Sequence, residues 1–248
     1  LSSLDSSLPV TLDVEGRHDV GSATVSDHLA HDLVEANIDF ASADELTVNA
    51  EGDGTVGTHL QTSLKELQKL GVDHIAMLEG TGGHQVDVSL GEGDVFAGGL
   101  TEGMFDTDPA VHFNLDIDQS QLEDDLTALV ANTENLVESG LDSASVHLEN
   151  EVNLDDVINH GVLDRLASLD GSLPVTLDVE GRGHVGEATV SDELAHDLVQ
   201  VGIDFAAADD LTVVAHGGEE GTHLHTSLKE LQKLGVDSVL LQDEIGRA

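Results

Sequence analysis

The sequence predicts an α/β fold: a repeat solenoid of β-α units with a mostly parallel sheet, helices on one face and an open polar face. Three observations predict it. They are a long internal repeat, strand-like alternation of apolar residues, and helix-like stripes that end at Gly or Asn. Residues 8–73 return as residues 173–237, with identical stretches such as Thr62–Asp73 and Thr226–Asp237. Such self-similarity is typical of repeat architectures.

Short segments of alternating apolar and polar residues predict the strands. Val10, Leu12 and Val14 alternate with polar residues, and similar alternation covers residues 46–51, 111–117 and 145–149. This pattern is typical of a strand with one buried and one solvated face. Strands covered on both faces read instead as continuous apolar runs, so we expect helices on one face only. The alternative is a compact open-sheet α/β domain.

Apolar residues three or four positions apart predict helices over residues 29–34, 64–70 and 122–137. A Gly or Asn, an aliphatic residue and Asp then form a helix stop, because the first residue tolerates left-handed backbone angles. The stops begin at Asn37, Gly71, Gly140, Gly202 and Gly235. The expected N-caps, or neighbours of caps, are Ser26, Thr58, Ser120 and Ser191. Short β-helix-β connections imply parallel strands with right-handed crossovers.

We expect one continuous array over residues 1–248. The repeat pattern is interrupted in a Gly-rich, irregular segment at about residues 79–108. Val86, Val88 and Leu90 still indicate one strand there. The chain opens with Leu1 rather than Met and shows no signal-peptide pattern there. We interpret it as a processed chain or a piece of a longer one.

Composition and charge exclude several function classes. Fifty acidic residues against eight basic ones give the 248-residue chain a formal net charge of −42, which repels nucleic acid and anionic membranes and attracts cations. Cysteine is absent, which excludes disulfides and thiolate metal sites. The sequence has no apolar run of about 20 residues, so we predict no membrane insertion. A nucleophile elbow, a phosphate loop and a zinc-binding helix are also missing, so we predict no enzyme, and we interpret the 14 histidines as solvent-facing.

The abundant carboxylates predict calcium binding. Acidic residues on the polar strand faces would form ladders, because neighbouring strands lie about 4.8 Å apart and calcium prefers several carboxylate and carbonyl oxygens. The ladder residues are Asp13, Glu15, Glu51, Asp87, Asp116, Glu149, Asp178 and Glu180. The candidate metal ligands on strands and turns are Asp13, Asp39, Asp73, Asp116, Asp142, Asp178, Asp204 and Asp237. The alternative is that these are solvated charges, with the turn Asp residues capping backbone amides.

Two segments carry a resemblance to a class of proteins. Residues 37–48 and 202–213 share the pattern of Gly or Asn, Ile, Asp, Phe and Ala before Leu-Thr-Val, and Leu-Gly-Val-Asp follows at residues 70–73 and 234–237. These phrases resemble repeat modules of large, acidic, cysteine-free bacterial surface and extracellular proteins. The resemblance implies export by type I secretion and a role as adhesin, matrix or surface-layer material.

The sequence therefore predicts an extracellular structural or adhesive repeat protein, stabilised by divalent cations such as Ca²⁺. We expect self-association, because both ends consist of nearly the same repeat material without obvious caps. Head-to-tail contacts of this kind yield filaments or layers. One alternative is a recognition module that binds a protein or glycan on its open sheet face. Another is an ordinary soluble protein of a high-salt organism, whose acidity serves only solvation.

Overall fold

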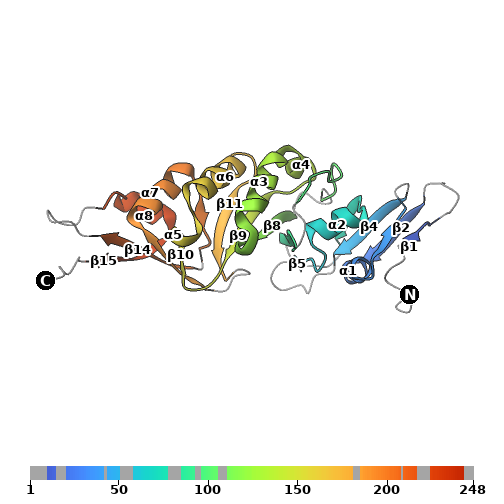
Figure 1. Cartoon of the computed structure of the whole chain (residues 1–248), viewed down its shortest axis with the longest axis horizontal. Coiled ribbons are helices and arrows are strands. Elements are labelled where there is room, and N and C mark those ends of the chain that lie inside the picture. Colours follow the sequence, from blue (N-terminus) through green and yellow to red (C-terminus); the bar gives the residue numbers. More distant parts are fainter. Residues whose placement is uncertain are drawn as a thin grey trace. The chain divides into compact units, whose positions relative to one another are not determined.

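The computed structural model describes residues 10–14, 21–41, 44–50, 58–77, 85–92, 96–105, 111–180, 185–207, 209–216 and 224–242. The chain folds into two compact units (Figure 1). Unit 1 comprises Leu1–Asp116 and Ala131–Ser143, and unit 2 comprises Ile117–Val130 and Ala144–Ala248. The fold is mixed α/β with parallel strands, which confirms the α/β class, whereas the solenoid of repeats stays a prediction.

Unit 1 contains three sets of parallel strands. β1 (Val10–Leu12) pairs with β3 (Ile38–Phe40), β4 (Glu45–Ala50) lies between β2 (Ser22–Ser26) and β6 (His74–Met77), and β7 (Gln85–Ser89) lies between β5 (Thr58–His59) and β8 (His112–Asp118). The helices of this unit are α1 (Asp27–Glu35), α2 (Leu64–Leu70) and α4 (Thr133–Glu138).

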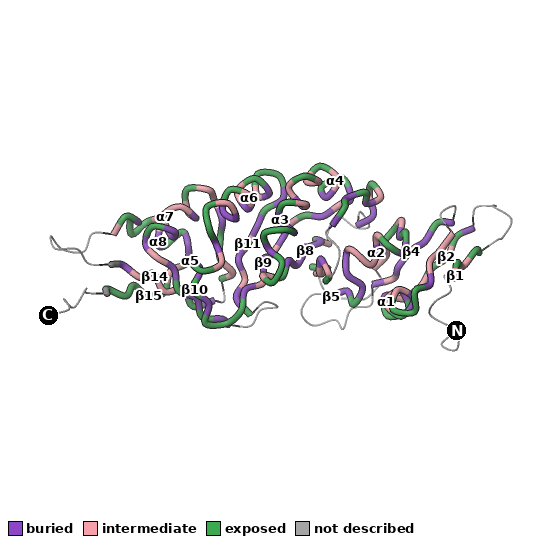
Figure 2. The backbone as a smooth tube through the Cα atoms, viewed as in Figure 1, coloured by how far each residue is buried: buried purple, intermediate pink, exposed green. Residues whose placement is uncertain are grey.

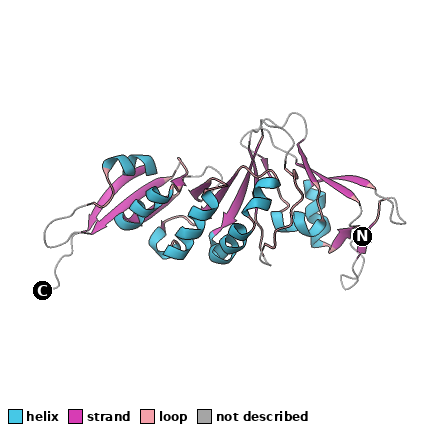
Figure 3. Ribbon diagram, turned by 90° about the horizontal axis from the view of Figure 1, so that it is seen from above, coloured by secondary structure: helices cyan, strands magenta, loops and turns pink. Residues whose placement is uncertain are grey.

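Unit 2 contains two sets of parallel strands. β11 (Val175–Val179) lies between β9 (Ser143–Leu148) and β13 (Asp204–Phe205), and the other set has the order β10 (Val152–Asn153), β12 (Glu187–Ser191), β14 (Asp210–His216), β15 (Val236–Gln242). Its helices are η1 (Gln119–Gln121), α3 (Leu122–Ala131), α5 (Leu154–Val157), α6 (His160–Asp170), α7 (Asp192–Val201) and α8 (Leu228–Leu234). Groups of one to three strands alternate with helices along the chain. Figure 3 shows the helices and strands coloured by type.

The strands bury alternate residues, as the sequence predicts. In β4, β9 and β11 every second side chain is buried and the side chains between them are partly or fully exposed (Figure 2). The buried positions are mainly Leu, Val, Ile and Ala, and the buried side chains of α1 and α7 include Ala30, Leu33, Ala195 and Leu198. β8 departs from the pattern, because Asn114 and Asp116 on its polar side are also buried.

The helix stops are confirmed by their backbone geometry. Asn37, Gly71, Gly140, Gly202 and Gly235 all have positive φ angles, between 53° and 96°. Asn37 and Gly202 occupy equivalent places in the two copies of the repeat, so Asn performs in one copy the turn that Gly performs in the other.

The expected N-caps are only partly correct. Ser26 and Ser191 cap α1 and α7 through their side-chain oxygens. Thr58 is instead part of β5, and Ser120 lies inside η1. α2 and α8 begin at Ser63 and Ser227, each of which forms a reciprocal capping box with the Glu three residues later.

The Gly-rich segment contains the expected strand, which is β7. Residues 78–84, 93–95 and 106–110 of this region lie outside the described residues. Between them, Phe96, Met104 and Phe105 are buried, and the ring of Phe105 lies 5.0 Å from that of Phe113 in β8. Residues 96–105 therefore contribute core packing to unit 1, although they form no regular element.

Candidate functional site

The most regular polar feature of the molecule is a carboxylate that holds two backbone amides. In unit 1 the Asp44 carboxylate accepts hydrogen bonds from the backbone N–H groups of Val14 and Gly21, both at 2.9 Å. In unit 2 the equivalent Asp209 accepts from Val179 at 2.8 Å and Gly186 at 3.0 Å. Each carboxylate thus joins the end of one strand to the start of the next.

A second pair of carboxylates repeats the same device at the helix starts. Asp27 accepts from the backbone N–H groups of Gln61 at 2.6 Å and Thr62 at 3.0 Å, and the Thr62 hydroxyl donates to the Asp27 carbonyl at 3.0 Å. In unit 2, Asp192 accepts from the backbone of His225 and Thr226, and the Thr226 hydroxyl donates to the Asp192 carbonyl.

The hydrogen bonds at Asp192 affect its ionisation. Burial opposes the charged form, but hydrogen bonds from Thr226 and His225 outweigh burial and hold the pKa of Asp192 below its usual value. The pKa of Glu230 is also lowered, mainly by the hydrogen bonds that Ser227 donates to it in the capping box of α8. Both carboxylates therefore stabilise the fold in their ionised form.

Three of the candidate metal ligands serve as backbone acceptors as well. Asp73 accepts from the N–H of Leu46 at 2.9 Å, Asp142 from Phe113 at 2.8 Å, and Asp237 from Leu211 at 3.0 Å. Each carboxylate follows a helix stop and contacts the strand of the preceding repeat unit. This geometry matches the alternative interpretation of the turn Asp residues as backbone caps.

The other candidate metal ligands lie on or beside the strands. Asp13 follows β1 and is exposed. Asp39 and Asp204 lie beside Thr11 and Thr176 in the parallel register. The register thus places a threonine, and not a second carboxylate, beside Asp39 and beside Asp204.

Three residues of the predicted acidic ladder lie beside residues that are not acidic. Asp116 lies beside Ser89, Asp87 beside Asn114, and Asp178 beside His147. The register places a neutral or basic partner next to each of these three carboxylates, which reduces like-charge repulsion between strands. In the β12–β14 pair, by contrast, Glu187 lies beside Asp210. Glu15 and Glu51 of the expected ladder lie outside the described residues.

Asn114 links the carboxylates of the β7–β8 pair. Its side-chain amide donates to Asp87 at 3.0 Å and to Asp116 at 2.9 Å, and its oxygen accepts from the Ser143 hydroxyl at 2.9 Å. The Nδ1 atom of His59 lies 3.7 Å from the Asp116 carboxylate. This buried polar network explains why β8 buries both of its faces.

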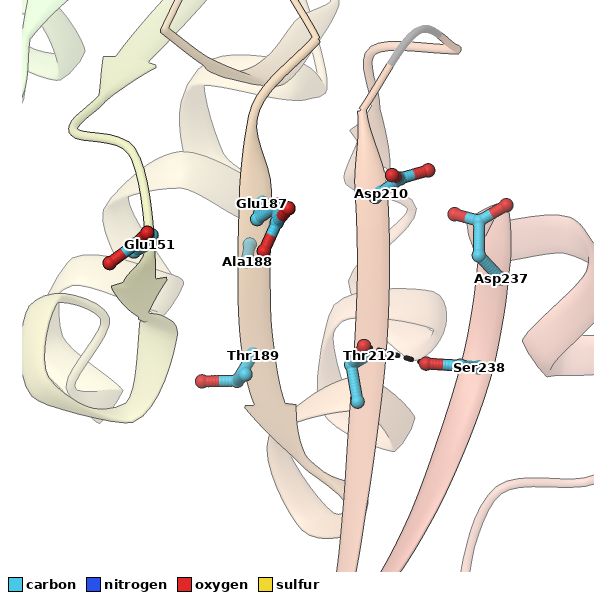
Figure 4. Close-up of a pocket in the computed structure, with 8 residues that line it drawn as sticks. All are labelled: Glu151, Glu187, Ala188, Thr189, Asp210, Thr212, Asp237 and Ser238. Carbon is cyan, nitrogen blue, oxygen red and sulfur yellow. Dashed lines mark hydrogen bonds between the residues drawn. The ribbon is translucent and has the colours of Figure 1, made fainter.

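The polar face of the β12–β14–β15 strands forms a shallow pocket of about 430 Å³ (Figure 4). Four acidic side chains surround it, and at its base the hydroxyls of Thr212 and Ser238 are 2.6 Å apart. The acidic residues are Glu151, Glu187, Asp210 and Asp237. Such a surface suits a hydrated cation better than an anionic or apolar ligand.

Within the described ranges, no three His, Asp or Glu side chains form a group that could hold a metal ion. Several histidines lie instead near a carboxylate of a neighbouring element. His31 lies 3.3 Å from Glu66, and the equivalent His196 lies 3.7 Å from Glu230. Similar pairs are His74–Glu45, His112–Asp142 and His147–Asp178.

Comparisons with protein-family models, curated proteins and solved structures found no match for the chain. Among the described helices, none is long and apolar enough to cross a membrane. The function is therefore inferred from the geometry of the chain's own residues.

Proposed function

We propose that this chain is an extracellular structural or adhesive repeat protein. Its β-α units would stack as a solenoid, and cations would stabilise them. The units would assemble head to tail into filaments or a surface layer.

The single observation that carries the proposal is the duplication of the carboxylate contacts. Asp27, Asp44 and Asp73 hold the backbone of one repeat, and Asp192, Asp209 and Asp237 hold the same positions of the other. An active site is usually assembled once, whereas these acidic residues perform the same structural task twice. Carboxylates that hold the backbone in the same way in both repeats support a scaffold role, because the units of a repeat protein contact mainly their neighbours.

Cation dependence follows from the net charge. A charge of −42 produces strong self-repulsion, which salt screens and which bound divalent ions would offset. The acidic pocket on β12, β14 and β15 is one place where such ions would concentrate. We retain calcium as the proposed ion because the available ligands are oxygen atoms of carboxylates, hydroxyls and the backbone.

The proposal is tested by sedimentation velocity and electron microscopy of the purified chain after removal of metal with a chelator. We expect monomers at low ionic strength, and larger species when calcium or sodium chloride is added. Comparing the two salts at equal ionic strength separates specific calcium binding from screening. A single monomeric species under all conditions would overturn the assembly, and equal thermal stabilisation by both salts would remove the role of calcium.

A further inference from the structure

α2 and α8 have the same sequence, Leu-Lys-Glu-Leu-Gln-Lys-Leu, and the same ends. Both are capped by a serine in a capping box, and both stop at a glycine in the left-handed conformation. Their local structures are therefore equal. Any difference in their burial has to come from what lies beside them.

In unit 1 the outer side of this repeat is covered. The backbone N–H of Lys65 donates to Leu90 at 3.2 Å, the Lys65 ammonium donates to the carbonyl of Gly91 at 3.0 Å, and the N–H of Ile75 donates to Met104 at 2.7 Å. A side chain at Gly91 would collide with Ser63, because its Cβ would lie 2.4 Å from the Ser63 hydroxyl oxygen. The described residues 90–92 and 96–104 thus lie against α2 and β6.

In unit 2 the described residues leave the same side of the repeat exposed. Leu228 is 83% exposed, whereas the equivalent Leu64 is 0% exposed. Val239 in β15 is 41% exposed, whereas Ile75 at the same place in β6 is 0% exposed. Among the described strands, β15 pairs with β14 alone. We define the C-terminal edge as Leu228, Val239, Leu240 and Leu241, all of which are exposed.

The opposite side of the repeat is covered in unit 2 and more exposed in unit 1. In unit 2, β10 pairs with β12, the Asn150 side chain accepts from the N–H of Glu187 at 2.9 Å, and Asp155 accepts from the N–H of Ser191 at 2.7 Å. In unit 1, β2 pairs with β4 alone among the described strands. Leu29 is 46% exposed there, against 8% for the equivalent Leu194. We define the N-terminal edge as Ala23, Val25 and Leu29; Ala23 and Val25 are half-buried, whereas the equivalent Ala188 and Val190 are buried.

Neither edge strand carries the free charges that usually protect an exposed edge. β2 reads Ser-Ala-Thr-Val-Ser without any charged residue, and the only charge in β15 is Asp237, which already holds the N–H of Leu211. Proteins normally protect exposed edge strands with charges, proline or bulges, because unpaired N–H and C=O groups recruit further strands. In a chain with a net charge of −42, two edges without free charges indicate that these strands pair with a further strand in the working protein.

We propose that the C-terminal edge of one copy docks on the N-terminal edge of a second copy of this chain, so that β15 pairs in parallel with β2 and the junction buries Leu228 and Leu29. This deepens the proposed function and rests on it. The pairing would continue the parallel order β12–β14–β15 of one copy with β2–β4–β6 of the next.

A junction of two identical C-terminal edges would not continue the parallel sheet. A two-fold axis between two β15 strands would make them antiparallel, or would place the helices of the two copies on opposite faces of the sheet. Neither arrangement buries Leu228 against a neighbouring helix while keeping the strands parallel. The head-to-tail contact is heterologous, and it propagates into a filament unless its rotation closes a ring.

The test uses two variants of the full chain, each with one blocked edge and the same added charge. The first is Leu228→Glu with Leu240→Glu, and the second is Thr24→Glu with Leu29→Glu. The matched control is Val137→Glu with Val185→Glu, two exposed apolar residues away from both edges. We expect each variant to fold because the substituted side chains are exposed, and circular dichroism checks this.

Sedimentation velocity is run on each variant alone and on the 1:1 mixture, under conditions in which the unmodified chain assembles. We expect each blocked variant alone to raise the dissociation constant by more than about tenfold, because a buried Glu pair at an interface costs well above the 1.4 kcal/mol that corresponds to tenfold. The mixture should form a heterodimer and nothing larger, since only one pair of intact edges remains. The control should assemble like the unmodified chain.

The outcomes separate the two proposals. If the unmodified chain remains monomeric, assembly itself is overturned, and the junction with it. If the unmodified chain assembles and either blocked variant assembles equally well, or the mixture stays monomeric, the junction is wrong while assembly stands. Homodimers of the variant with the intact C-terminal edge would indicate a symmetric contact and also overturn the junction.

Discussion

The two copies of the long repeat have nearly the same sequence and the same local geometry, yet they bury opposite sides. The copy in unit 1 is covered where the copy in unit 2 is bare, and the reverse holds on the other side. The contrast shows that burial in a repeat protein is set by the neighbour and only partly by the residue. Leucine at an equivalent position is core in one copy and surface in the other.

The largest expected effect concerns the equivalent leucines of α2 and α8. Leu64→Ala should lower the free energy of unfolding by about 2–5 kcal/mol, because it leaves a cavity in a closed core. Leu228→Ala should change it by only about 0.5 kcal/mol or less at a protein concentration that keeps the chain monomeric. Urea unfolding followed by circular dichroism measures both. Equal losses would show that the outer side of α8 is covered in solution.

The next effect concerns the carboxylates that hold two amides. Asp44→Ala and Asp209→Ala should each destabilise the chain by about 1–3 kcal/mol for every amide left without an acceptor. The losses should be similar in the two copies, because the same bonds are made in both. Asn at either position retains one carbonyl oxygen and should have an intermediate effect. Urea unfolding again provides the measurement, and a loss in only one copy would contradict the equivalence.

A smaller effect is expected at the capping boxes. Ser227→Ala should cost about 1 kcal/mol, the usual value for loss of an N-cap. Ser63→Ala should cost at least as much, since the Ser63 side chain also packs against Gly91. The thermal unfolding midpoints of the two variants and of the unmodified chain test this order. A more damaging change at Ser227 would contradict the closer packing of α2.

The smallest effect is a pH dependence. The pKa values of Asp192 and Glu230 are lowered in the folded chain, so their stabilisation is fully present above the ordinary pKa of a carboxyl group. It is lost as pH falls through the lower folded value. Asp192→Asn should therefore reduce the slope of stability against pH in the acidic range and leave the slope near neutral pH unchanged. Thermal unfolding between neutral pH and about pH 3 measures it; an unchanged acidic slope would show that Asp192 contributes little.

Much of the fold could be predicted because it depends on local chemistry. The helix stops at Asn37 and Gly202 follow from backbone angles that few residues adopt, and the strand alternation identifies β4 and β9 directly. Ser63 carries the Ser-x-x-Glu signature of a capping box and could have been found in the sequence. The choice of Thr58 was wrong because a strand and a connecting turn precede α2.

The acidic residues were harder to predict, because their role depends on strand register. A shift of two residues in the β7–β8 register would place Asp116 beside Asp87, whereas the observed register places it beside Ser89. The bare edges could not be predicted at all from the local sequence, since Leu64 and Leu228 lie in identical helices. Only the neighbours in space distinguish them.

The carboxylate contacts of Asp44 and Asp209 have a further consequence. Each carboxylate joins two backbone amides that lie seven positions apart in the sequence, at Val14 and Gly21 or at Val179 and Gly186. The copies already differ there, with His18-Asp19 in one and Gly183-His184 in the other. We expect a foreign peptide inserted between these paired amides to be tolerated as long as both amides still reach the carboxylate.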